Sequence, residues 1–313
     1  MPQAKDPNTL AVGGQALIEG VMMRAGERWG AAARRPDGEI VTTGDAVPTW
    51  ARTVDDIPVV RGALAMVETI MVGLRALKWS ARVADPEEEA EVSNRALAVT
   101  TAVTLLIFTA IFAVVPAAAS HGLGFEGFAF AAVEGVFRLV LFGGYLFLIG
   151  RSPGIQRTFA YHGAEHKVIA AHEHGAPMTV EGVRPFSVRH ARCGTDFLLL
   201  VVVVAIVVFS LVGQASWPVL IASRVLGLPI VAGLAYEVLK LAKRRPDSRV
   251  VKVMTAPGLA LQAMTTRPPT DEQIEVAIAA LSMVDLRSPL PTAASAPVLG
   301  AAPAGASAAE GAE

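Results

Sequence analysis

Residues 197–212 read FLLLVVVVAIVVFSLV, a block that contains no charged side chain. A helix needs about 20 predominantly apolar residues to cross a hydrocarbon layer of about 30 Å, and three more stretches approach or exceed that length. They are residues 97–119, 128–149 and 219–241. A backbone in hydrocarbon must satisfy its own hydrogen bonds, so helices are the expected form. The blocks also lack the alternation of β-barrel strands. The sequence therefore predicts an α-helical polytopic membrane protein with four transmembrane helices.

The overall composition agrees with this prediction. Hydrophobic residues make up 53% of the 313-residue chain and charged residues only 18%, against about a quarter in soluble domains. The alternative, a large soluble protein with buried helices, would have to bury four such blocks. A net charge of −1 gives no indication of a nucleic-acid partner. The single cysteine, Cys193, excludes an intramolecular disulfide and suits a reducing compartment.

The distribution of Lys and Arg predicts the orientation. Basic residues are frequent before the first block, between the second and third, and after the fourth, whereas residues 120–127 and 213–218 contain none. The positive-inside rule then places both termini and the central loop in the cytoplasm. The expected organisation is a cytoplasmic N-terminal region, two helices, a His-rich cytoplasmic loop, two helices, a cytoplasmic segment and a disordered tail: residues 1–95, 96–150, 151–196, 197–241, 242–287 and 288–313.

The N-terminal region is predicted to be a small α+β unit. Residues 16–23 form an apolar run expected to be one strand, and the turn signal at residues 36–38 separates two more strand candidates, so a small antiparallel sheet is expected. Apolar residues at three- and four-residue steps predict a helix over 61–83. Trp79 and its basic residues suit the membrane surface, and packing on the sheet is the alternative. A second amphipathic helix is expected over 271–281, with Thr270 as N-cap before Gln273.

The central loop contains the candidate metal ligands. His162, Glu165 and His166 form a His-x-x-Glu-His pattern, in which both histidines lie on one face of a helix, close enough to share an ion. The same spacing occurs in inverted zinc peptidases, where the glutamate is the general base. Further candidate ligands are Glu173, His190 and Cys193. Imidazole and thiolate ligands favour zinc among divalent metals. The alternative is that these residues form an ordinary solvated helix face.

Four segments resemble one family: GGQALIEGVMMR from Gly13, YHGAEHK from Tyr161, RCGT from Arg192 and PGLALQ from Pro257. They are similar to the bacterial YqhQ-like membrane family, a domain of unknown function often labelled a predicted metal-dependent enzyme. The resemblance implies a multi-pass protein of the bacterial cell (inner) membrane. It also makes Glu19 an additional candidate site residue, although Glu19 facing solvent beside a tight strand pairing is the alternative. Ala191 and His172 depart from the family pattern, and the second departure weakens His172 as a ligand.

Charged residues inside the predicted spans form a second candidate site. Glu134 and Arg138 are one helical turn apart and are expected to pair, while Arg224 and Glu237 flank Pro229. Such residues are costly in hydrocarbon and often functional.

The leading hypothesis is a metal-dependent membrane hydrolase. Its ligands would be His162 and His166, completed by Glu173 or by His190 and Cys193, with Glu165 as general base. The expected partners are the lipid bilayer and an anionic lipid or membrane-associated substrate, held by basic residues of the loop: Arg184, Arg189 and Arg192. The alternative is a non-catalytic scaffold with a structural His/Cys cluster, or a small transporter.

Overall fold

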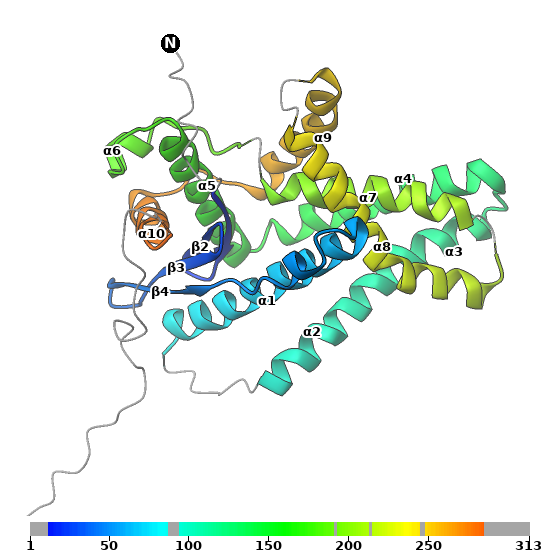
Figure 1. Cartoon of the computed structure of the whole chain (residues 1–313), viewed down its shortest axis with the longest axis horizontal. Helices are drawn as coiled ribbons and strands as arrows, with labels where there is room; N and C mark the ends of the chain where they lie inside the picture. Colours follow the sequence, from blue (N-terminus) through cyan, green and yellow to red (C-terminus); the bar gives the residue numbers. More distant parts are fainter. Residues whose placement is uncertain (1–11, 87–93, 191–192, 213–214, 245–247, 285–313) are drawn as a thin grey trace, which may run out of the picture.

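The computed structural model describes residues 12–86, 94–190, 193–212, 215–244 and 248–284 (Figure 1). It is mostly helical, with a four-stranded antiparallel sheet at the N-terminal end of the described chain, in the order β1-β2-β3-β4. The strands are β1 (Val12–Leu17), β2 (Gly20–Ala25), β3 (Arg28–Arg34) and β4 (Ile40–Ala46). The predicted disordered tail, residues 288–313, lies outside the described residues.

The sheet confirms one strand prediction and corrects another. The strands β3 and β4 flank the turn at residues 36–38, as predicted. The run over 16–23, however, is a hairpin and not one strand, because the chain reverses between Leu17 and Gly20. The turn residue Glu19 has a φ of +51°. A non-glycine residue in this conformation is uncommon, so the sequence carried no turn signal there.

Helices cover both faces of the sheet, since successive strand residues point to opposite sides. On one face Leu17, Met22 and Trp29 pack with Val72 and Ala76 of α1 (Pro58–Ala84). On the other, Val21 and Met23 share a core with side chains of α5 (Pro153–Glu173) and α10 (Asp271–Ser282). The predicted helices over 61–83 and 271–281 are therefore present, and the capping box of Thr270 and Gln273 forms. Trp79 is partly buried against the sheet core, which confirms the alternative that this helix packs on the sheet.

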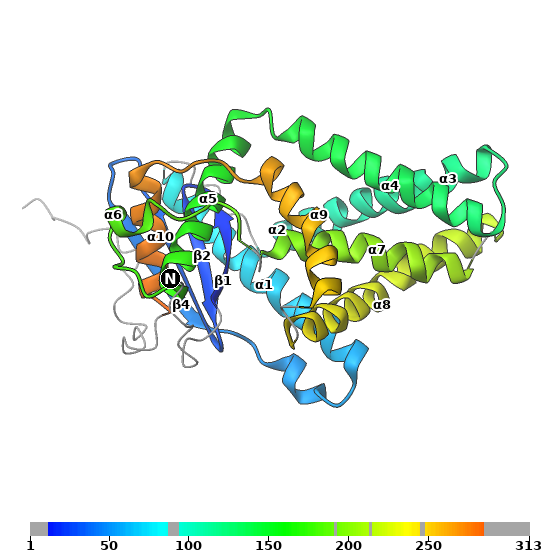
Figure 2. The same ribbon diagram turned by 90° about the horizontal axis from the view of Figure 1, so that it is seen from above.

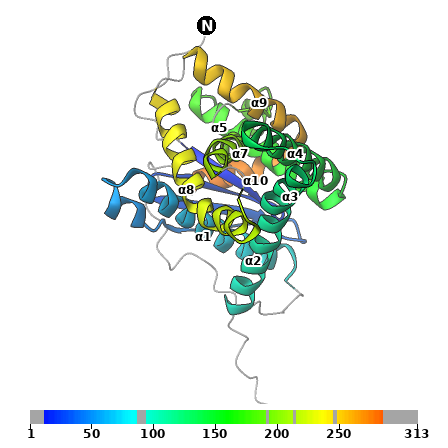
Figure 3. The ribbon, with the colours of Figure 1, turned by 90° about the vertical axis from the view of Figure 1, so that its right-hand side faces the viewer.

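The remaining long helices form a bundle beside this layered unit (Figure 2). Figure 3 looks along the bundle, in which α7 contacts both α4 and α8. The other elements are η1 (Trp50–Val54), α2 (Asn94–Thr109), the π-helix η2 (Ala110–Val114), α3 (Val115–Gly122), α4 (Gly127–Ile149), α6 (Val180–Val183), α7 (Gly194–Val212), α8 (Trp217–Arg244) and α9 (Arg249–Thr265).

Three helices of the described chain are long and apolar enough to cross a membrane: Ala98–Gly122, Ala129–Ile149 and Trp217–Ala242. They coincide with three of the four predicted spans. The block of residues 197–212 is helical, but its apolar helical part, Leu199–Val212, is shorter than the three candidate spans. Three candidate spans are thus present, and the fourth remains a prediction.

The charged residues of these helices are paired across the bundle. The carboxylate of Glu134 accepts hydrogen bonds from Arg138 at 2.6 Å and from Arg224 at 2.8 and 3.1 Å. The predicted Glu134–Arg138 pair is therefore confirmed, with Arg224 as a further partner. Glu237 pairs instead with Arg61 of α1, at 2.5 and 2.7 Å. Arg224 and Glu237, grouped in the sequence by Pro229, thus belong to two separate contacts.

Candidate metal centre

Three potential ligand side chains converge where α5 meets the start of α7. His162 and His166 lie one turn apart on α5, with ring centroids 4.3 Å apart. Cys193 directly precedes Gly194, the first residue of α7. One ligand atom from each of the three residues lies within 4.8 Å of the other two. Helix periodicity places the two histidines on one face of α5, whereas the tertiary fold brings Cys193 next to His162.

Backbone carbonyls set the orientation of both imidazole rings. The Nδ1 atom of His162 lies 2.8 Å from the carbonyl oxygen of Thr265, and that of His166 lies 2.6 Å from the carbonyl of Val188. A carbonyl only accepts, so each Nδ1 carries a hydrogen, and an imidazole that is neutral in this tautomer has its lone pair on Nε2. Metal-binding histidines commonly have this arrangement. The carbonyls therefore leave both Nε2 atoms available as potential ligand atoms.

The two Nε2 atoms have different surroundings. His162 Nε2 lies 3.2 Å from Cys193 Sγ. His166 Nε2 is buried and has no hydrogen-bond partner among the described residues. Burial, followed by the charge of His162, lowers the pKa of His166 to about 3, so its imidazole is neutral at physiological pH. A buried lone pair without a partner costs free energy, and a metal ion would satisfy it. The donor set therefore fits a divalent metal.

Glu165 lies next to this group on the inner side of α5. Its side chain is 4% exposed, its Oε2 atom has no hydrogen-bond partner in the described part of the chain, and the backbone N–H of Gly14 bonds to its carboxylate. Burial, which is the largest effect, together with nearby Cys193, raises its pKa to about 7. A carboxyl group with this pKa can both accept and return a proton near neutral pH.

The remaining sequence-predicted residues make contacts of their own. His190 Nε2 is 3.4 Å from a carboxylate oxygen of Glu173, and the His190 ring centroid is 6.0 Å from that of His166. These two residues therefore pair beside the three-residue group. Glu19 lies elsewhere, since its carboxylate bonds to the guanidinium of Arg157 and accepts from Tyr161 Oη at 3.2 Å. This contact ties the β1–β2 turn to α5.

The buried amide side chain of Gln262 holds the backbone of His190, shortly before Cys193. This residue was not predicted as part of the site. Gln262 of α9 is fully buried. Its Oε1 atom accepts from the backbone N–H of His190 at 3.0 Å, and its Nε2 atom donates to the carbonyl of the same residue at 2.9 Å. Gln262 is the last residue of the PGLALQ segment, so the family resemblance could have identified it as a candidate site residue. The contacts of the Thr265 and Val188 carbonyls could not be predicted from the sequence, because every residue has a backbone carbonyl.

Most of the chain is similar to proteins of one known family. A family described as "Protein of unknown function (DUF1385)" matches residues 57–286. A relative from Bacillus subtilis (strain 168), described as "Uncharacterized protein YqhQ", is 35% identical over 286 residues, or 86% of this chain and 90% of that protein. The chain belongs to this family. The resemblance predicted from the sequence is thereby confirmed. No solved structure matches the chain.

Within this member of the DUF1385 family, Gly14 makes the position of Glu165 sterically feasible. A Cβ atom at Gly14 would lie 2.7 Å from both the Glu165 Cδ atom and the Met22 carbonyl oxygen. We expect Gly14→Ala to destabilise the protein by about 1–3 kcal/mol through overpacking. Thermal unfolding in detergent measures this effect. The matched control is Gly13→Ala, since Gly13 has nothing within 4 Å of that position. Equal melting temperatures for the two variants would contradict the expected role of Gly14.

Proposed function

We propose that the chain is a metal-dependent integral membrane protein with hydrolase-like chemistry at the cytoplasmic face. The observation that carries the proposal is the convergence of His162, His166 and Cys193 within 4.8 Å, with both histidines oriented through Nδ1. These three residues would hold the ion, and zinc is the divalent metal that such ligands favour. Among the described residues the group has three members, and a catalytic site with three protein ligands would keep one position open for water or substrate.

Each residue then has a defined role. A bound divalent ion supplies Lewis-acid polarisation of the bond to be cleaved. Glu165 accepts a proton from the attacking water and returns it to the leaving group, for which a pKa of about 7 is suited. Glu173 and His190 lie beside the ligands as a hydrogen-bonded pair and would complete the surrounding shell.

The membrane part of the proposal follows from the apolar helices and the Lys/Arg distribution. The three candidate spans and α7 would cross the bacterial inner membrane with both termini in the cytoplasm, and the domain boundaries stay as predicted from the sequence. The substrate would be an anionic lipid or another membrane-associated molecule. Of the loop arginines, Arg184 bonds to Asp271, Arg189 is exposed, and Arg192 lies outside the described residues.

Metal content tests the proposal. Protein purified in mild detergent without chelator should contain about one divalent ion per chain, and the His162→Ala/His166→Ala variant should contain none. His172→Ala is the matched control, because His172 lies on the same helix outside the three-residue group, and should keep its metal. A folded wild-type protein without metal, or equal metal content in the double variant, would refute the metal centre.

A non-catalytic scaffold is the second candidate, favoured by the burial of His166 and the partial burial of His162 and Cys193. Cobalt substitution separates the two candidates, since a catalytic site keeps an open position and a structural site does not. The absorption bands of the cobalt protein should shift on addition of azide if the fourth position is open. An unchanged spectrum would favour the structural cluster.

A further inference from the structure

In the described part of the chain, one side of α1 is largely exposed. The opposite side buries Val72 and Ala76 against the sheet. Val60 and Val67 are seven residues apart and so lie on one side of the helix. With nearby Ile70, they are between 40% and 45% exposed. Leu64, Met71 and Leu74 are half-buried along the same side. We refer to this row, Val60 to Leu74, as the outer stripe of α1.

The charges of α1 are asymmetric. The helix contains a single acidic residue, Glu68, which is 3% exposed and accepts a hydrogen bond from the backbone N–H of Ala51. Two basic residues beyond the stripe, Arg75 and Arg82, are exposed. The accessible surface of α1 is therefore apolar along the stripe and positive beyond it. Such a pattern matches a bilayer that contains anionic lipids.

The outer stripe begins beside α8, one of the candidate spans. A Cβ atom on Gly62 would lie 2.8 Å from the Gly233 carbonyl, and one on Gly233 would lie 2.3 Å from that of Val59. The two glycines thus allow the helix backbones to meet closely, as small residues do between helices in membranes. The first turns of α1 therefore pack directly on α8, a helix on which Leu226 and Ile230 are also exposed.

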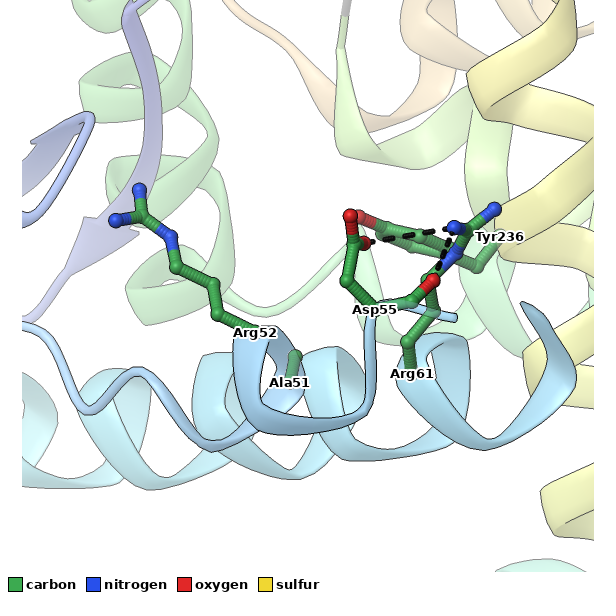
Figure 4. Close-up of a pocket in the computed structure, with 5 residues that line it drawn as sticks. All are labelled: Ala51, Arg52, Asp55, Arg61 and Tyr236. Atoms are coloured by element: carbon green, nitrogen blue, oxygen red, sulfur yellow. Dashed lines mark hydrogen bonds and ion pairs between the residues drawn. The ribbon is translucent and has the colours of Figure 1, made fainter. Parts of the chain in front are cut away.

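Polar groups and a tryptophan lie where the first turn of α1 packs on α8. A pocket of about 360 Å³ is lined by Ala51, Arg52, Asp55, Arg61 and Tyr236. Figure 4 shows these side chains and the contact between Arg61 and Asp55. The guanidinium groups are paired, Arg61 with Glu237 and Arg52 with Glu27, so no anion is needed to balance them. Trp50 and Ile57, on the same connection, are exposed. Aromatic and charged side chains at one level are typical of a membrane interface.

We propose that the outer stripe of α1, with Trp50 and Ile57, lies in the cytoplasmic leaflet and that Arg75 and Arg82 face anionic headgroups. The inference rests on the proposed membrane insertion of α8. It has a consequence for the metal centre. Gln15 of β1 contacts Gly73 of α1, and its neighbour Gly14 contacts Glu165. Contact of the outer stripe with the leaflet would therefore fix the distance of α1, β1 and Glu165 from the membrane surface. A membrane-associated substrate could then reach Glu165.

Single-tryptophan proteins test the inference. The sequence has four tryptophans, and three variants would keep Trp50, Trp217 or Trp29 alone, with phenylalanine at the other positions. Each full-length protein is reconstituted into vesicles of phosphatidylcholine and phosphatidylglycerol with brominated acyl chains. Trp50 should be quenched as strongly as Trp217, which is exposed at the far end of α8. Trp29, buried against the sheet, should keep its fluorescence.

The outcomes separate this inference from the proposal on which it rests. Quenching of Trp217 without quenching of Trp50 would overturn the placement of α1 and leave membrane insertion intact. Absence of quenching for both would remove the membrane proposal itself. If a phenylalanine variant fails to fold, a spin label at Val67→Cys in a Cys193→Ser background gives the same information. The label should collide more with oxygen than with a water-soluble nickel complex, and a label at Asp37→Cys should do the reverse. Shielding of the Val67 label from both reagents would indicate a protein partner and refute the lipid contact.

Discussion

Glu134→Ala is expected to destabilise the protein by about 3–5 kcal/mol, because it leaves two buried cations without a counter-charge. Glu134 is 2% exposed, and Arg138 and Arg224 are 5% and 0% exposed. The carboxylate is the shared partner of both guanidinium groups. The ring of Phe209 lies beside both cations, 4.4 Å from the Arg224 Cζ atom, but a ring face does not replace a full negative charge. We therefore expect the bundle to loosen where α4, α7 and α8 meet.

Thermal unfolding in detergent measures this effect, with two comparisons. The triple variant Glu134→Leu/Arg138→Met/Arg224→Leu removes all three charges and should be much closer to wild type, since apolar replacement of a buried ion group is often neutral or stabilising. Arg184→Ala breaks an exposed pair with Asp271 and should change the melting temperature little. If Glu134→Ala unfolds at the same temperature as Arg184→Ala, the cluster does not stabilise the bundle.

Gly163→Ala is expected to damage both stability and metal binding. A Cβ atom at Gly163 would lie 2.1 Å from the carbonyl oxygen of Arg267, and the backbone N–H of Arg267 bonds to the carbonyl of Phe159. Since the obstacle is backbone, α5 and the segment after α9 must separate. That movement withdraws the Thr265 carbonyl from His162 Nδ1. We expect a loss of about 1–3 kcal/mol from overpacking and a fall in metal affinity of about 10–100-fold, as for other outer-shell losses.

The matched control is Gly154→Ala on the same helix, where nothing lies within 4 Å of the added atom. Alanine favours helices over glycine by up to about 1 kcal/mol, so this variant should be as stable as wild type or more so. Melting temperatures and metal titration with a chromophoric chelator give both readouts. Wild-type metal affinity in a folded Gly163→Ala protein would show that the Thr265 contact is not needed for the centre.

Local features of the chain were predictable because each depends on neighbouring residues alone. Helix periodicity alone places His162 and His166 one turn apart, and the Thr270–Gln273 capping box forms within one turn. The turn at residues 36–38 contains glycine and proline, and it was predicted. The turn at Glu19 contains neither at its centre and was missed. Its positive φ is maintained by a contact distant in sequence, with Arg157 and Tyr161.

Sequence alone therefore predicts the helical class, the position of the apolar blocks, the strand candidates around residues 36–38 and the paired histidines. Only the tertiary structure decided which distant residues meet. It brought Cys193 to His162, 31 residues away, and Thr265 to the same ring across 103 residues. It also joined Arg224 to Glu134 and Arg61 to Glu237. Spacing along a helix sets local neighbours, whereas contacts between elements depend on how their surfaces pack. Gly14 and Gly163 are examples, since a side chain at either position would collide with Glu165 or with the backbone that orients His162.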